Sequence, residues 1–171
     1  MAVRRVVTGH DAEGRSVVVA DEPSDKLSFG ARGGGIHLVW ARDDVAHFPD
    51  DGSQPPSRTA FPAPGGCRMS VFELPPGDAG EFDEFVSDSL SEFSDPDRPG
   101  MHRTASLDFD IVLEGTVGLE LDGQEAVLNP GDVVVQNGTS HRWHNRGSVI
   151  ARVASVVVGA DHDLVASAEV N

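Results

Sequence analysis

Short apolar, β-branched runs alternate with turn residues along most of the chain. Near the N-terminus, the runs 3–7 and 16–20 are joined by the turn-rich segment GHDAEG, which predicts a hairpin. Residues 36–41 and 67–74 have the alternation typical of two further strands. Between them, residues 43–66 are rich in Pro, Gly, Ser and Asp, which indicates a long surface loop.

One segment has a different period. From Phe82 to Phe93, apolar residues recur every three or four positions and acidic residues fill most of the places between them. Asp78 and Glu81, near the start of the segment, suit the positive end of a helix dipole. We therefore expect one short amphipathic helix here, with its phenylalanines packed on the body of the protein.

The second half of the chain reads as strands and turns. We expect strands at residues 107–114, 116–121, 126–128, 133–136, 141–145 and 149–158. Glycine-containing turns separate most of them, and no helical segments lie between them to connect parallel strands. This pattern predicts an antiparallel barrel or sandwich.

Composition and charge narrow the classes of function. A chain of 171 residues is the size of one domain. With 13 Lys plus Arg against 28 Asp plus Glu, its formal net charge is -15, which argues against nucleic acids and anionic membranes as partners. The single cysteine, Cys67, cannot form an intramolecular disulfide, so we expect a cytoplasmic protein. We find no apolar stretch long enough for a membrane span, no GxSxG elbow and no Walker-type GK[ST].

Two segments bring together residues with useful chemistry. Alternate residues of a strand share one face, so His102, Thr104 and Asp108 in the stretch HRTASLDFDIVLEG are expected to converge. In the later stretch GTSHRWHN, the same alternation puts His141 on one face and His144 on the other.

These segments resemble the two conserved motifs of the cupin superfamily. The defined positions of the first motif, HxH(x)3-4E(x)6G, are occupied here by His102, Thr104, Asp108 and Gly115. The second motif, G(x)5PxG(x)2H(x)3N, is present in a slightly shortened form, with Gly131, Gly138, His141 and Asn145 at its positions. Thr104 stands where the first motif has its second histidine, and Asp108 stands where it has glutamate.

The resemblance implies a fold and an assembly. The chain would be all-β, with the cupin double-stranded β-helix, a jelly-roll barrel, extended by N-terminal strands and one short helix. Residues 67–160 would form the barrel, residues 1–66 would pack on it as strands and a loop, and residues 161–171 would form a C-terminal tail. The barrel would bind a small molecule, and the protein would form a homodimer.

The resemblance also implies a metal site. Metal-binding cupins hold a divalent metal with histidines and an acid from the first motif and a histidine from the second. Here the ligands would be His102, Asp108 and His141, and the metal Fe, Zn, Mn or Ni. Thr104 is a poor neutral ligand and would instead offer a catalytic hydroxyl to substrate or water. Aspartate is one methylene shorter than the usual glutamate, which weakens the site.

Other side chains are expected to line the pocket. These are Trp143, Asn145 and Trp40. For Trp143, a place in the core is an equal alternative, and Asn145 has the alternative of satisfying strand ends.

Two functions remain open at this point. One is a metal-assisted enzyme of the oxygenase, decarboxylase, isomerase or cyclase type that acts on a small oxygenated metabolite. The other is a metal-free binding or sensing cupin, in which His102, Asp108 and His141 satisfy local polar groups. The loss of the second histidine favours this alternative.

Overall fold

The computed structural model describes residues 2–29, 33–54, 61–78, 94–95 and 97–164. Within these residues every strand pair is antiparallel and no α-helix occurs, which confirms the predicted all-β class. The helix expected at residues 81–93 lies outside the described residues. No helix in the described part is long and apolar enough to cross a membrane.

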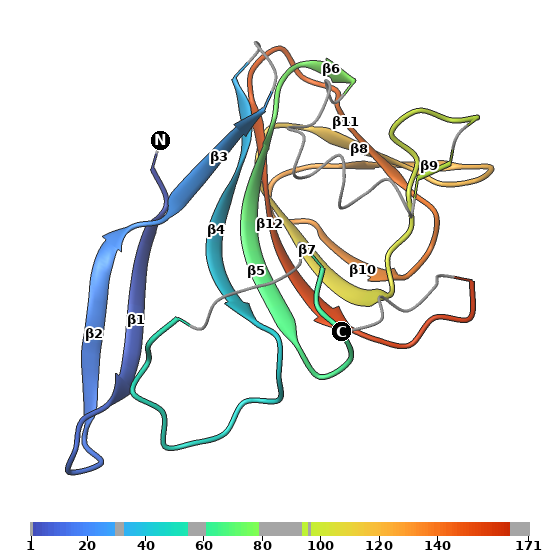
Figure 1. Cartoon of the computed structure of the whole chain (residues 1–171). Coiled ribbons are helices and arrows are strands. Elements are labelled where there is room, and N and C mark those ends of the chain that lie inside the picture. The colour runs from blue at the N-terminus through green and yellow to red at the C-terminus, as the bar shows by residue number, and fades with distance from the viewer. Residues whose placement is uncertain (1, 30–32, 55–60, 79–93, 96, 165–171) are drawn as a thin grey trace.

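Two strands near the N-terminus form a separate hairpin. They are β1 (Arg4–His10) and β2 (Ser16–Pro23), as the sequence predicts. The hairpin stands to one side of the main body of the protein (Figure 1). Gly14, in the connecting turn, has a φ of 76°, a conformation that glycine adopts without the steric cost of a side chain.

The main body has two sheets (Figure 1). The six-stranded sheet has the order β10-β7-β12-β5-β4-β3. Its strands are β3 (Asp25–Phe29), β4 (Gly34–Arg42), β5 (Cys67–Leu74), β7 (Ser106–Glu114), β10 (Val133–Asn137) and β12 (Ala151–Gly159). The four-stranded sheet has the order β6-β11-β8-β9. Its strands are β6 (Gly77–Asp78), β8 (Val117–Glu120), β9 (Glu125–Leu128) and β11 (Arg142–Asn145).

The observed strands match most of the expected ones. The six strands predicted after residue 106 correspond to β7 through β12, and the run at 67–74 is β5. Strands β3 and β6 are not predicted by the sequence, since neither has a clear apolar alternation. Because β3 and β4 belong to the same sheet as β5, that sheet also includes strands that precede residue 67.

The core lies between the two sheets. It contains seven buried apolar residues: Leu74, Val112, Val117, Leu119, Trp143, Ala151 and Val153. The rings of Phe72 and Trp143 meet edge to face across it, with centroids 5.8 Å apart. This contact joins β5 of one sheet to β11 of the other.

Along β7 the interior changes from polar to apolar. Its buried residues are Ser106, Asp108, Asp110 and Val112. Since alternate residues of a strand share a face, these four side chains point the same way. Only Val112 belongs to the apolar core cluster, so β7 carries polar groups into the protein at its N-terminal end.

Candidate functional site

Two histidines from distant parts of the chain lie side by side. His102 and His141 form an isolated antiparallel bridge, with backbone N–H···O distances of 3.0 and 2.8 Å. Their imidazole centroids are 4.4 Å apart and the ring planes are inclined by 54°. The structure therefore brings together the histidines of the two cupin-like segments.

The Nδ1 atoms of both rings lie next to backbone carbonyls. His102 Nδ1 is 3.0 Å from Gly100 O, and His141 Nδ1 is 2.9 Å from Thr139 O. Because a carbonyl only accepts, each Nδ1 must carry the proton. Gln136 Nε2 also lies 2.9 Å from His141 Nδ1, but Thr139 supplies two oxygen acceptors to that amide, so Nδ1 can keep its proton. This assignment leaves a lone pair on each Nε2.

Burial keeps the two imidazoles neutral. Loss of hydration, with a smaller contribution from like-charge repulsion by the neighbouring His102, lowers the pKa of His141 to about 3, against the raising effect of its hydrogen bond to Thr139. Burial also lowers the pKa of His102, against the raising effect of its hydrogen bond to Gly100. Histidine binds metals as a neutral imidazole, and its other ring nitrogen commonly donates an N–H hydrogen bond to a carbonyl, a carboxylate or water.

A chain of polar groups follows from Thr104 to Asp108. The hydroxyls of Ser106 and Thr104 are 2.8 Å apart, and Ser106 also hydrogen-bonds the Asp108 carboxyl. Asp108 is 6% exposed, and its Oδ1 has no hydrogen-bond partner. Burial, with a smaller contribution from Asp110, raises the pKa of Asp108 to about 6, while the Ser106 hydrogen bond opposes the shift.

Asp108 is near the histidine pair in the sheet but does not complete a three-ligand cluster with it. Its register partner on β10 is Gln136, the residue whose amide contacts His141. Across the residues that the structure describes, no three His, Cys, Asp or Glu side chains converge closely enough to hold a metal ion. The predicted set therefore appears as a histidine pair and a separate buried carboxyl.

One acid in the interior was missed from the sequence. Asp110 is 4% exposed, and burial raises its pKa to about 6 against an opposing hydrogen bond from Ser155. The two residues are opposite each other in the pairing of β7 with β12. The sequence alone could have predicted its burial, because Asp110 is two residues after Asp108 on the same strand and therefore shares its face.

The two predicted pocket tryptophans have different surroundings. Trp143 is 9% exposed and belongs to the core cluster, where it contacts Phe72. Trp40 is opposite Met69 in the pairing of β4 with β5. Met69 and Phe72 are three residues apart on one strand and so lie on opposite faces, which puts Trp40 on the face away from the Trp143 contact.

Asn145 is occupied by hydrogen bonds to the backbone. Its Nδ2 donates to Leu74 O at 2.7 Å and to Val149 O at 2.6 Å, and its Oδ1 accepts from Gly147 N at 2.8 Å. These bonds connect β11 to β5 and to the turn before β12. All of these contacts are to backbone groups at or near strand ends, which is the alternative role expected for Asn145.

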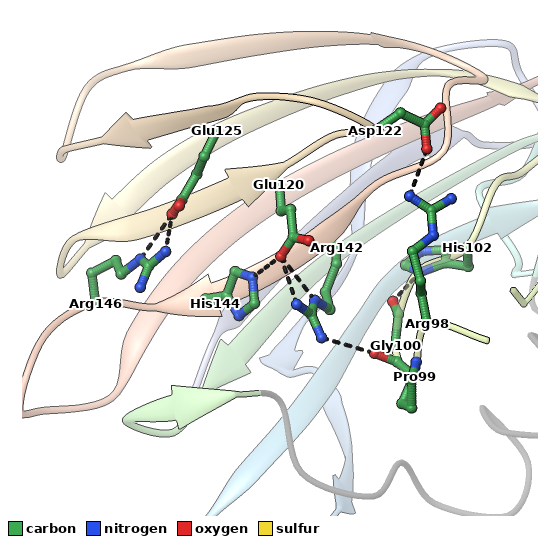
Figure 2. A network of polar contacts seen from close by, with 10 residues as sticks. All are labelled: Arg98, Pro99, Gly100, His102, Glu120, Asp122, Glu125, Arg142, His144 and Arg146. Carbon is green, nitrogen blue, oxygen red and sulfur yellow. Dashed lines mark hydrogen bonds and ion pairs between the residues drawn. The ribbon is translucent and has the colours of Figure 1, made fainter. Parts of the chain in front are cut away.

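His144 belongs to a different cluster from His141. Its Nε2 lies 2.7 Å from Glu120 Oε2, to which Arg142 also donates (Figure 2). Strand alternation predicts this separation, because His144 and the core residue Trp143 are neighbours on β11 and point to opposite faces.

The donor chemistry of the site fits a divalent metal. Two neutral imidazoles with lone pairs on Nε2 are suitable ligands for Fe, Zn, Mn or Ni. The unpartnered buried Oδ1 of Asp108 is the kind of atom that a bound cation or an added donor would satisfy. His102, His141 and Asp108 are thus the residues that could hold a metal, although the three do not form a closed ligand set.

Comparisons with known proteins identify the family. The sequence model of the Cupin domain family matches residues 94–158. The chain is 34% identical over 155 residues to Phomopsin biosynthesis cluster protein C' of Diaporthe leptostromiformis, an alignment that covers 83% of this chain and 70% of that protein. The chain belongs to the cupin superfamily.

A second relative and one solved structure complete the comparison. The cupin-domain-containing oxidoreductase fogC of Aspergillus ruber is 28% identical over 145 residues, which covers 84% of this chain and 64% of that protein. A Cupin 2 conserved barrel domain protein from Salinispora arenicola has 15% identity and a TM-score of 0.45, and covers 78% of this chain and 82% of that one.

Proposed function

We propose that this cupin is a metal-assisted oxidoreductase that acts on a small oxygenated metabolite, such as an enol, a β-dicarbonyl compound or a carboxylate. The observation that carries the proposal is the pair of neutral imidazoles, His102 and His141, whose centroids are 4.4 Å apart. Relatives that are named cupin-domain-containing oxidoreductases favour oxidation over the other cupin reactions.

His102 and His141 would hold the metal through Nε2, and Asp108 would add a carboxylate oxygen. A divalent metal supplies Lewis acidity toward a substrate oxygen and, if it is iron, access to redox chemistry. Two neutral ligands and one acid leave coordination positions open for substrate, as catalytic metal sites require.

The protein's own groups would orient the substrate and manage protons. Thr104 is 1% exposed and its hydroxyl is hydrogen-bonded to Ser106, which also bonds Asp108. This arrangement can hold a proton at the Thr104 hydroxyl beside the site. Further along β7, Val112 is part of the apolar core, which excludes water from that side.

Metal analysis of untagged protein tests the proposal. Cells supplied with Fe, Zn, Mn and Ni should yield wild-type protein with near-stoichiometric metal, and His141→Ala should lower it to background because it removes one of two imidazoles. His144→Ala is the matched control, since His144 contacts Glu120 rather than the histidine pair, and its removal leaves the bonds from Arg142 to Glu120 in place, so the metal content should not change. Wild-type protein without bound metal would contradict the proposal.

A metal-free binding cupin is the second candidate. It is favoured by Thr104 in the position of a ligating histidine and by the lack of a three-ligand cluster among the described residues. In that case the melting temperature of the wild type would respond to small carboxylates or enols but not to Fe, Zn, Mn or Ni. The metalloenzyme requires stabilisation by at least one of these metals.

We also propose a homodimer built on the outer face of β7 and β10. Four apolar residues lie there in two register pairs, Val133 with Ile111 and Val135 with Phe109, and each is 39–59% exposed. A chain with a net charge of -15 repels its copies at long range, so an uncharged strip is the part of its surface best suited to contact a second copy. A two-fold contact would cover the strip with itself.

A further inference from the structure

The turn that precedes His102 is fastened to the four-stranded sheet by one arginine. Arg142 is opposite Glu120 in the pairing of β11 with β8. Its Nε and Nη2 donate to Glu120 Oε2 at 3.2 and 2.6 Å, while its Nη1 donates to Pro99 O at 3.0 Å (Figure 2). One planar guanidinium therefore joins a strand of the sheet to the backbone of the turn.

The same arginine packs against the next residue of the turn. Gly100 has a φ of 82°, and a Cβ atom built on it would lie 3.1 Å from Arg142 Cδ. The Gly100 carbonyl is the acceptor for His102 Nδ1, at 3.0 Å (Figure 2). The arginine thus bonds the Pro99 carbonyl and lies beside Gly100, the residue whose carbonyl is this acceptor.

Backbone hydrogen bonds from Met101 N to Arg98 O and from Asp95 N to Met101 O also hold the turn, but its other side-chain ion pairs are more exposed than that of Arg142. Arg98 pairs with Asp95 and Asp122, each at 2.7 Å, but its side chain is 40% exposed and that of Asp122 is 69% exposed. Ion pairs this exposed contribute about 0–1 kcal/mol. Arg142 and Glu120 are less exposed, at 27% and 32%, and Arg142 makes three hydrogen bonds.

We infer that Arg142 is a positioning residue for His102. By fixing Pro99 and Gly100, it keeps the Gly100 carbonyl in place to accept the Nδ1 proton, so that the lone pair of His102 stays on Nε2. The tautomer is a property of the metal-free protein, whereas the consequence for metal affinity rests on the proposed function. Loss of the hydrogen bond that orients a metal-ligating histidine typically changes its metal affinity by about 10–100-fold.

Arginine is suited to this role by its geometry. Its rigid fork presents donors toward Glu120 and Pro99 at the same time, whereas a lysine ammonium is a single point on a flexible stem. Arg142→Lys would therefore keep the charge beside Glu120 but lose the fixed link to the turn. Arg146→Lys is the matched control, because Arg146 makes the same kind of pair with Glu125 on β9.

The test is the tautomer of His102 in metal-free protein, measured from imidazole ¹⁵N chemical shifts and assigned with His102→Gln. We expect the Nδ1–H form in the wild type and in Arg146→Lys, and a mixture of tautomers in Arg142→Lys. Glu120→Gln, which weakens the anchor without altering the turn, should shift His102 in the same direction and keeps the test available if Arg142→Lys does not fold.

The outcomes separate the positioning role from a general loss of structure and from the proposed function. The inference is overturned if the His102 tautomer is unchanged in Arg142→Lys or, should that variant not fold, in Glu120→Gln. It is also overturned if Arg146→Lys changes the tautomer equally, because that would indicate a general loss of structure. A tautomer change confined to Arg142→Lys and Glu120→Gln supports it, and a 10–100-fold weaker binding of Zn²⁺ alone by the same variants would support it further. If the tautomer shifts as expected while the wild type binds no metal, the positioning role stands and the proposed function fails.

Discussion

The backbone of His102 is hydrogen-bonded to that of His141 in both directions, at 3.0 and 2.8 Å, although the residues are far apart in the sequence. This bridge sets the 4.4 Å separation of their rings. Because the backbone fixes the pair, replacing either side chain should leave the other close to its place. The two histidines can therefore be tested separately.

The histidine pair should weaken the metal-free fold in acid. The pKa of His141 is about 3 in the folded state and about 6.5 when unfolded, so below pH 6.5 the unfolded chain binds a proton that the folded one does not. The contribution of the neutral His141 side chain to the free energy of unfolding is therefore fully present above pH 6.5 and is lost as the pH falls toward 3. Between pH 6.5 and 5 the wild type should lose about 2 kcal/mol more than His141→Gln in chemical denaturation. Equal losses would contradict the buried neutral imidazole.

The stability that Asp110 contributes should depend on pH in the opposite direction from that of His141, and Asp110→Asn tests this. Burial raises the pKa of Asp110 to about 6, so the folded carboxyl binds its proton more tightly than the unfolded one. That stability is fully present below the unfolded pKa of about 3.9 and is lost as the pH rises through 6. Relative to wild type, metal-free Asp110→Asn should therefore gain about 1 kcal/mol between pH 5 and 7.5. A pH-independent difference in unfolding free energy would show that Asp110 is not held in this way.

Glu73 should be important for stability although it lies away from the histidine pair. Its side chain is 4% exposed and bonds Lys26 at 2.6 Å and Arg152 at 2.5 Å. Burial raises its pKa, but these two cations lower it more, and the net shift is downward. Glu73→Gln leaves the cations near a neutral group and should cost about 3 kcal/mol.

A surface pair serves as the control for Glu73. Glu125→Gln breaks a pair with Arg146, whose side chain is 48% exposed, and should cost less than about 1 kcal/mol. The comparison is made by urea denaturation at neutral pH. Similar costs for the two variants would mean that the buried position of Glu73 adds nothing.

The proposed dimer should depend on the outer strip of β7 and β10. Ile111→Glu puts a charge in the middle of that strip and should yield a monomer in size-exclusion chromatography with light scattering. Val127→Glu changes an equally apolar side chain, 60% exposed on β9, and should remain a dimer. A wild type that is monomeric at micromolar concentration would refute the dimer.

Local sequence patterns were enough to predict most of the strands and the two segments that carry His102 and His141. The alternation along residues 106–114 follows from the two-residue period of a strand, so the shared face of Thr104 and Asp108, and the opposite faces of Trp143 and His144, could be predicted without knowing any neighbour. The same local rule could have found Asp110. The same residues carry the resemblance to the cupin motifs, and the family comparison confirms it.

Which of these residues meet depends on how distant segments pair in the fold. The 4.4 Å approach of His102 to His141, the separate position of Asp108 and the link from Arg142 to Pro99 all depend on strand pairing between distant segments. Trp40 lies on the face away from the Trp143 contact because a bulge between Leu38 and Trp40 shifts the register with β5. Periodicity gives the face of a strand on which a side chain lies, but long-range pairing and register fix which strand lies beside it and at what height.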